Sequence, residues 1–183
     1  RVLNQFENFP FWNALFVESG IKVQLSAASS NALFQKGTAH IMSDNLCYPA
    51  KLVSGHIMDL IEKGVDRIFY PMVFYEESHF SDSANSYNCP IVSGYPDVVR
   101  NVINPQERYN IPYDMPSINL ADKKLLKRFC VDYLAGLGVP RSEAAQAYEK
   151  AEEAQNQYKV QVRSVAAEIL ENARPDHLLV ANA

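Results

Sequence analysis

Two cysteines stand out because each lies beside a proline where the chain changes direction. Cys47 comes two residues before Pro49, at the expected start of an amphipathic helix, and Cys89 directly precedes Pro90. Unpaired amides and the positive end of the helix dipole stabilise a thiolate at a helix N-terminus. Two thiolates that converge could ligate a metal ion or an iron–sulfur cluster. The spacing alone leaves open that both are inert, packed side chains, because no C-x-x-C pair is present.

The sequence positions of the other candidate residues favour a structural role over a role in ligand binding. Cys130 shares a helical face with Leu126 and Leu134, which favours a packed thiol. His56 lies on the same expected helix face as Val53, which favours a hydrogen-bonded core histidine over a ligand. The sequence has no glycine-rich phosphate loop, no G-x-S-x-G elbow and no H-E-x-x-H motif. Cys47 and Cys89 therefore remain the principal candidates.

The elements that must position these cysteines alternate between strands and helices. Alternation of this kind indicates βαβ units and a mainly parallel sheet, which binds ligands at the carboxyl ends of its strands. We therefore expect both cysteines to reach one edge of the sheet, within about 10 Å of each other. The expected strands cover residues 1–4, 21–26 and 66–74, and the expected helices cover residues 9–20, 29–37, 48–64 and 121–138, with a further helix that begins at 94 after a long polar loop.

The segment 141–173 differs because it contains no glycine and no proline. Spacings of four and three residues predict one long helix with a heptad stripe that is apolar apart from Gln155. This helix could pack on the sheet, or it could project as an arm against a second domain or subunit. The stripe consists of Ala144, Tyr148, Ala151, Gln155, Tyr158, Val162, Val165 and Ile169.

Composition narrows the class of protein. The chain has 183 residues, of which 48% are hydrophobic and 21% charged, with a formal charge of −4 and a pI near 5.6. These values give no reason to expect nucleic acid as a partner. No apolar run is long enough for a membrane helix, and no signal peptide is evident, so we expect neither a membrane partner nor secretion. Three cysteines favour reduced thiols and a cytoplasmic location.

The boundaries predict part of a longer protein, since the chain lacks an initiator methionine. We expect an α/β domain at 1–140, a long helix at 141–174, and at 175–183 the first strand of a following domain.

Four stretches together resemble one known family. They are RVLNQFENFPFWNALFVESG, CYPAKLVSGHIMDLIEKGVD, IFYPMVFYE and NCPIVSGYPDVV. They resemble the domain that accompanies, and is often fused to, the ATP-dependent activators of 2-hydroxyacyl-CoA dehydratases. They are similar also to the dehydratase subunits and to double-cubane-cluster proteins.

The resemblance implies a Rossmann-like, mainly parallel sheet flanked by helices, and a component of a low-potential electron-transfer system. It implies that Cys47 and Cys89 ligate a [4Fe–4S] or larger iron–sulfur cluster, and we expect Lys51 and His56 to join them in binding the cofactor. The partners implied are other domains of the parent chain, or a dehydratase or activator subunit, with acyl-CoA as a bound ligand. A third cysteine would come from sequence after Ala183, so we expect no cluster on this chain alone. The alternative is a non-catalytic interaction module with structural cysteines and a long helix that docks a partner.

Overall fold

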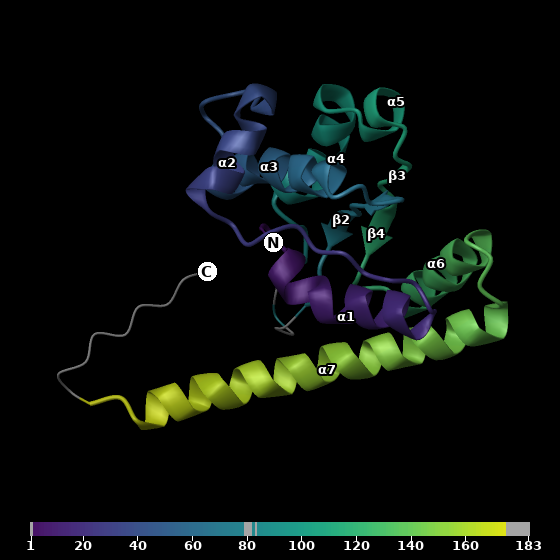
Figure 1. Cartoon of the computed structure of the whole chain (residues 1–183). Coiled ribbons are helices and arrows are strands. Elements are labelled where there is room, and N and C mark those ends of the chain that lie inside the picture. Colours follow the sequence, from purple (N-terminus) through teal and green to yellow (C-terminus); the bar gives the residue numbers. More distant parts are fainter. Residues whose placement is uncertain (1, 79–81, 83, 175–183) are drawn as a thin grey trace.

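A computed structural model describes residues 2–78, 82 and 84–174. Its centre is a short parallel ladder with helices on both sides (Figure 1). On one side of the strands lie α2 (Asn31–Gly37), α3 (Tyr48–Glu62), α4 (Pro90–Val102) and α5 (Pro105–Tyr109). On the other side lie α1 (Gln5–Glu18), α6 (Lys123–Gly136) and α7 (Arg141–Glu171). Parallel pairing and helical cover on both faces, as the alternation predicted, are therefore present.

The ladder consists of two pairs that share one register as far as Val73 and Ile118, and the register shifts between Val73 and Tyr75. β1 (Ile68–Phe69) pairs with β3 (Tyr113–Asp114), and β2 (Met72–Tyr75) pairs with β4 (Ser117–Asn119). The single strand expected at 66–74 is thus interrupted. In this register Pro71 and Pro116 occupy equivalent positions, and a proline has no N–H to donate to a ladder.

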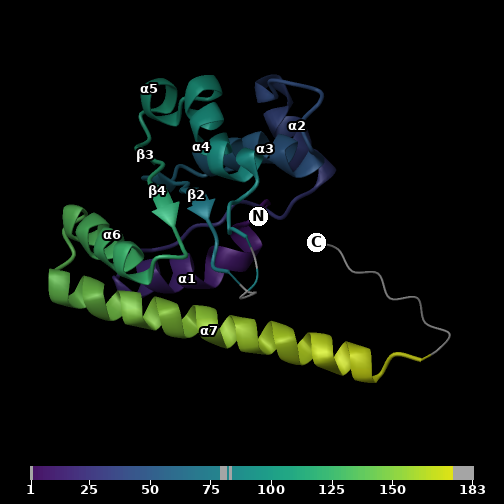
Figure 2. The same cartoon turned by 180° about the vertical axis from the view of Figure 1, so that it is seen from behind.

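The first helical layer packs on β2 and β4. α1 (Gln5–Glu18), α6 (Lys123–Gly136) and α7 (Arg141–Glu171) surround a shared core. The long helix expected at 141–173 is confirmed as α7. The turns of α7 that contact α6 and α1 are buried. The C-terminal end of α7 extends past α1 in both views (Figures 1 and 2). The core of this layer includes Phe11, Leu15, Val73, Ile118, Leu126, Cys130, Leu134 and Tyr148.

The second layer packs on β1 and β3. α3 (Tyr48–Glu62) and α4 (Pro90–Val102) form its core with these strands, and α2 (Asn31–Gly37) packs on α3. The Ser30 side chain caps α2 by accepting a hydrogen bond from the Leu33 N–H at 3.1 Å. A short 3-10 helix, η1 (Thr38–His40), and α5 (Pro105–Tyr109) complete the layer.

Three expectations were wrong in detail. Residues 2–4 form no strand, because Leu3 adopts a left-handed φ of 56° and the chain enters α1 at Gln5. The segment 21–26 is not paired with any strand that the structure describes. The helix expected from 94 begins at Pro90, because a proline fits the first turn of a helix.

A complete Rossmann-like sheet is not present, since the described strands form two-stranded ladders only. The segment expected as the first strand of a following domain, 175–183, lies outside the described residues.

Candidate functional site

The two candidate cysteines occupy the same local position in two helices. Cys47 is the N-cap residue of α3, with φ −61° and ψ 149°, and Cys89 is the N-cap residue of α4, with φ −54° and ψ 134°. In each helix a proline follows within the first turn. Neither side chain caps its helix with a hydrogen bond, and both thiols are exposed. The expected helix-mouth position of Cys47 is therefore confirmed, and Cys89 occupies the same position in α4.

The start of α3 lies beside α4. Burial raises the pKa of Tyr95 on α4, a hydrogen bond with Ser54 of α3 opposes this rise, and the nearby Cys47 thiol adds to it. Ser54 lies seven residues after Cys47, and Tyr95 lies six residues after Cys89. Each cysteine is therefore about 10 Å along its own helix from this contact, at a rise of 1.5 Å per residue.

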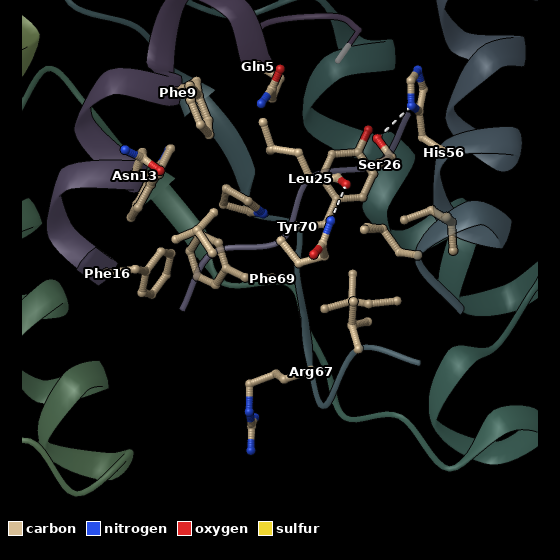
Figure 3. A pocket seen from close by; sticks show the side chains of 18 of the residues that line it. Gln5, Phe9, Asn13, Phe16, Leu25, Ser26, His56, Arg67, Phe69 and Tyr70 are labelled. Atoms are coloured by element: carbon tan, nitrogen blue, oxygen red, sulfur yellow. Dashed lines mark hydrogen bonds between the residues drawn. The ribbon is translucent and has the colours of Figure 1, made fainter. Parts of the chain in front are cut away.

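A cavity of about 570 Å³ lies on another part of the molecule, between α1, the segment 21–26, α3 and β1 (Figure 3). We call it the α1–α3 cavity. Its wall is rich in aromatic rings, and the Phe69 ring lies 4.9 Å from the Trp12 ring and 5.2 Å from the Phe16 ring, between centroids. No sequence pattern indicates this cavity, because its walls come from segments far apart in the chain.

Two cations that line the α1–α3 cavity, Arg67 and Lys63, are paired with carboxylates. The Arg67 guanidinium donates to both carboxylate oxygens of Asp114, at 3.0 and 2.8 Å. The Lys63 ammonium lies 2.8 Å from the Asp59 carboxylate and donates to the Leu25 carbonyl at 3.1 Å. The charges of Arg67 and Lys63 are therefore already neutralised by carboxylates of the domain, which disfavours binding of an anionic ligand by these two side chains.

Residues 1–181 match the family model described as "CoA enzyme activase uncharacterised domain". The chain belongs to this family. The match confirms the resemblance and places the chain among domains associated with CoA enzyme activases. Searches of curated proteins and of solved structures gave no match. Among the described residues, no helix of this activase-family domain is long and apolar enough to cross a membrane.

Two further residues expected at the cofactor have other neighbours in this activase-family domain. The Lys51 ammonium donates to the Asp44 carbonyl at 2.7 Å and so braces the loop that leads to Cys47. His56 is buried, and its Nδ1 lies 2.8 Å from the Ser26 hydroxyl (Figure 3). Its Nε2 lies 3.0 Å from the Ser29 hydroxyl. His56 lies nine residues after Cys47, about 13 Å along α3.

The third cysteine has a different environment. Cys130 is fully buried in the core that α1, α6 and α7 share, and burial raises the pKa of its thiol. The structural role expected for it is therefore supported.

The ligand set offered by the domain is small. In the part of the chain that the structure describes, no group of three or more His, Cys, Asp or Glu side chains could hold a metal ion. A [4Fe–4S] cube has four irons that need terminal ligands. The two exposed thiols, Cys47 and Cys89, are therefore fewer than the ligands that such a cube needs.

Proposed function

We propose that this activase-family domain supplies two thiolate ligands, Cys47 and Cys89, to an iron–sulfur cluster of a dehydratase and activator system. The observation that carries the proposal is the matched placement of two exposed thiols as N-cap residues of neighbouring helices α3 and α4. A [4Fe–4S] or larger cluster would supply low-potential one-electron chemistry when bound.

The chemistry of a helix start suits this role. At each helix start the first amides have no intrahelical acceptor, and their dipoles favour negative charge nearby. Thiolates at such positions are better ligands than neutral thiols, and amides that donate to cluster sulfur atoms tune its potential. Exposure matters equally, because the remaining ligands would come from outside this chain.

The completing partner would be another domain of the parent chain, or a dehydratase or activator subunit, and acyl-CoA is the ligand class that such a system would bind. We therefore expect the isolated domain to hold no stable cluster. It would act as one component of a system rather than as an enzyme by itself.

A cobalt titration tests the paired ligands on this chain alone. Thiolate ligation of Co²⁺ produces charge-transfer absorption in the near ultraviolet, and Co²⁺ tolerates the tetrahedral sulfur sites that iron and zinc use. We expect this absorption from the anaerobic, reduced domain, and its loss in both Cys47→Ser and Cys89→Ser. The matched control, Cys130→Ala, should retain it because this thiol is buried in another core.

The proposal would be contradicted if the thiolate absorption survived in either single serine variant, since one of the two cysteines would then be unnecessary for binding the ion. Absence of any thiolate band in the folded wild-type domain would contradict it equally, because the two sulfur atoms would then be too far apart to share an ion.

A second candidate function, docking of a partner helix, is favoured by the far half of α7. There the heptad stripe continues on the surface, where Val162, Val165 and Ile169 are 48%, 55% and 55% exposed. A stripe of this kind packs against a second helix in coiled coils. We propose that it docks an apolar helix of another domain or subunit.

Self-association provides the first test, because a second copy carries the same stripe. We expect concentration-dependent dimers in sedimentation equilibrium that Ile169→Glu weakens about tenfold or more. Glu168→Gln, which lies next to it in the helix, serves as the control. A monomer at all concentrations would exclude pairing between copies and leave only a different helix as the partner.

A further inference from the structure

One wall of the α1–α3 cavity is the edge of the β1–β2 strand at Phe69 and Val73, which pairs with no other strand among the described residues. Beyond Val73 the same edge is occupied, since the Glu76 N–H donates to the Ser86 carbonyl at 2.8 Å and the Asn88 N–H donates to the Phe74 carbonyl at 2.9 Å. The backbone N–H groups of Ile68, Tyr70 and Met72 donate to the strand that contains β3 and β4, at 2.9, 2.8 and 2.8 Å. Successive residues of a strand present their N–H groups to opposite edges. The N–H groups of Phe69 and Val73 therefore face the other edge, and both residues line the cavity.

The opposite wall is a segment with the form of a strand and no strand neighbour. Residues 21–26 are extended, with Lys22 and Gln24 exposed and Val23 and Leu25 partly buried. The end of this segment is held where the Ala27 N–H donates to the Asp59 carboxylate at 2.8 Å. Among the described residues, no backbone–backbone hydrogen bond involves residues 22–26.

The connections around the cavity follow the rules of a parallel sheet. From the segment 21–26 the chain passes through α2 and α3 to β1, which is a βαβ crossover. The helix before this segment, α1, lies on the other side of the ladder from α3 (Figure 1). Helices on opposite faces before and after a strand mark the point where the strand order of an open sheet reverses.

The entry to α1 lies at the carboxyl end of β2. The Asn4 and Asn8 side-chain amides donate to the carboxylate of Glu76, the residue after β2, at 3.1 and 3.2 Å. A strand in the cavity that ran parallel to β2 would end at the same edge. It would therefore end beside Val2, which also lines the cavity, and could turn into α1 through the left-handed Leu3.

We propose that the α1–α3 cavity is the place of a further, central β-strand, formed by a segment that directly precedes Arg1 in a longer polypeptide. It would lie parallel to both walls and join 21–26 to the β1–β2 strand in one four-stranded sheet. A strand covered by α1 on one face and α3 on the other needs a continuous run of Val and Ile. Five such residues span about 17 Å.

The lining of the cavity favours a strand over a small molecule. A volume of 570 Å³ lies within the common range for ligand sites. However, Arg67 and Lys63 are already paired with carboxylates, whereas the Phe69 and Val73 amides face the cavity. Backbone N–H groups along a strand edge are complemented best by the backbone of another strand, which supplies carbonyl acceptors at the same spacing.

Hydrogen exchange on an extended chain tests the proposal. The domain is expressed with Lys-Val-Ile-Val-Ile-Val added directly before Arg1, and a control carries Lys-Ser-Gly-Ser-Gly-Ser of the same length. With the apolar extension we expect the exchange of the Phe69 and Val73 amides to slow about tenfold or more. The Ile68, Tyr70 and Met72 amides, already bonded, serve as internal references and should change less. An alternating extension, Lys-Thr-Val-Thr-Val-Thr, replaces the apolar one if that variant aggregates.

The proposal is overturned if the Phe69 and Val73 amides exchange at the same rate with the strand-forming and the Ser-Gly extensions. This holds whether neither extension slows exchange or both slow it equally, because a flexible Ser-Gly tail cannot form a specific strand. Failure here would leave the thiolate proposal untouched, since Cys47 and Cys89 do not line this cavity.

Discussion

The side chain of Gln155 in α7 accepts a hydrogen bond from the backbone N–H of Phe11 in α1, at 3.1 Å. Its amide nitrogen also donates to the Glu7 carbonyl at 2.7 Å. Phe11 and Glu7 are four residues apart, so in a regular helix these two groups would bond each other. Pro10 precedes Phe11 and weakens the helix there, because it lacks an N–H. Gln155, the polar exception in the heptad stripe, thus fastens α7 to α1.

Gln155→Leu should destabilise the domain by about 2 kcal/mol, because it leaves a buried donor and acceptor without their side-chain partner. Urea unfolding followed by far-ultraviolet circular dichroism measures the change. Gln157→Leu is the matched control, since that side chain is exposed and should alter the free energy of unfolding by less than about 0.5 kcal/mol. Equal effects of the two substitutions would show that the bridge to α1 contributes nothing.

The ion pairs of Asp59 lead us to expect that the domain loses stability in acid. The Lys63 ammonium, aided by Lys36 and the Ala27 N–H, holds the pKa of this buried carboxyl well below its ordinary value of 3.8. A depressed folded-state pKa contributes stability that is complete above the unfolded-state pKa, starts to decline below about pH 4, and is lost only as the pH falls through the folded-state value. Asp59→Asn should cost about 1.5–3 kcal/mol at pH 7 and progressively less as the pH falls from about 4 to about 2.

Urea midpoints measured between about pH 7 and pH 2 test this difference. The control is Glu62→Gln, which removes an exposed partner of Lys36 and should have a small effect at every pH. A cost for Asp59→Asn that stayed constant with pH would show that the charge of Asp59 is not what matters.

Gly55 allows α2 to lie directly on α3. A Cβ atom at Gly55 would lie 2.1 Å from the Leu33 carbonyl oxygen, which is a backbone atom and cannot move alone. Gly55→Ala should therefore destabilise the domain by about 1–3 kcal/mol. Gly94→Ala in α4 meets no atom within 4 Å and should stabilise it by up to about 1 kcal/mol through helix propensity. Thermal midpoints that moved in the same direction would contradict this packing.

Thiol alkylation should separate the three cysteines by burial. Cys47 and Cys89 are exposed, whereas Cys130 is buried and its pKa is raised by burial. With iodoacetamide at neutral pH, we expect Cys47 and Cys89 to react well ahead of Cys130, as mass spectrometry of peptides would show. A reconstituted parent protein should protect Cys47 and Cys89. Equal rates at all three thiols in the native domain would remove the basis for treating Cys130 as structural.

Several local features could be predicted from the sequence because short-range chemistry decides them. A proline two residues after Cys47 and a glycine at 64 set the limits of α3 within two residues. The absence of glycine and proline from 141–173 predicted α7, and spacing with Leu126 and Leu134 predicted that Cys130 would be buried. Periodicity identifies which face of a helix is apolar.

The tertiary structure alone decided what those faces contact. Segment 21–26 has the alternation of a strand, but a strand needs a neighbour to accept and donate its hydrogen bonds, and alternation does not supply one. The heptad stripe could not show that its first half packs on α1 while its second half stays exposed. Gln155 interrupted that stripe without explanation, because its partners lie more than 140 residues away in sequence. Contacts of this range depend on how the whole chain folds, which local propensity does not encode.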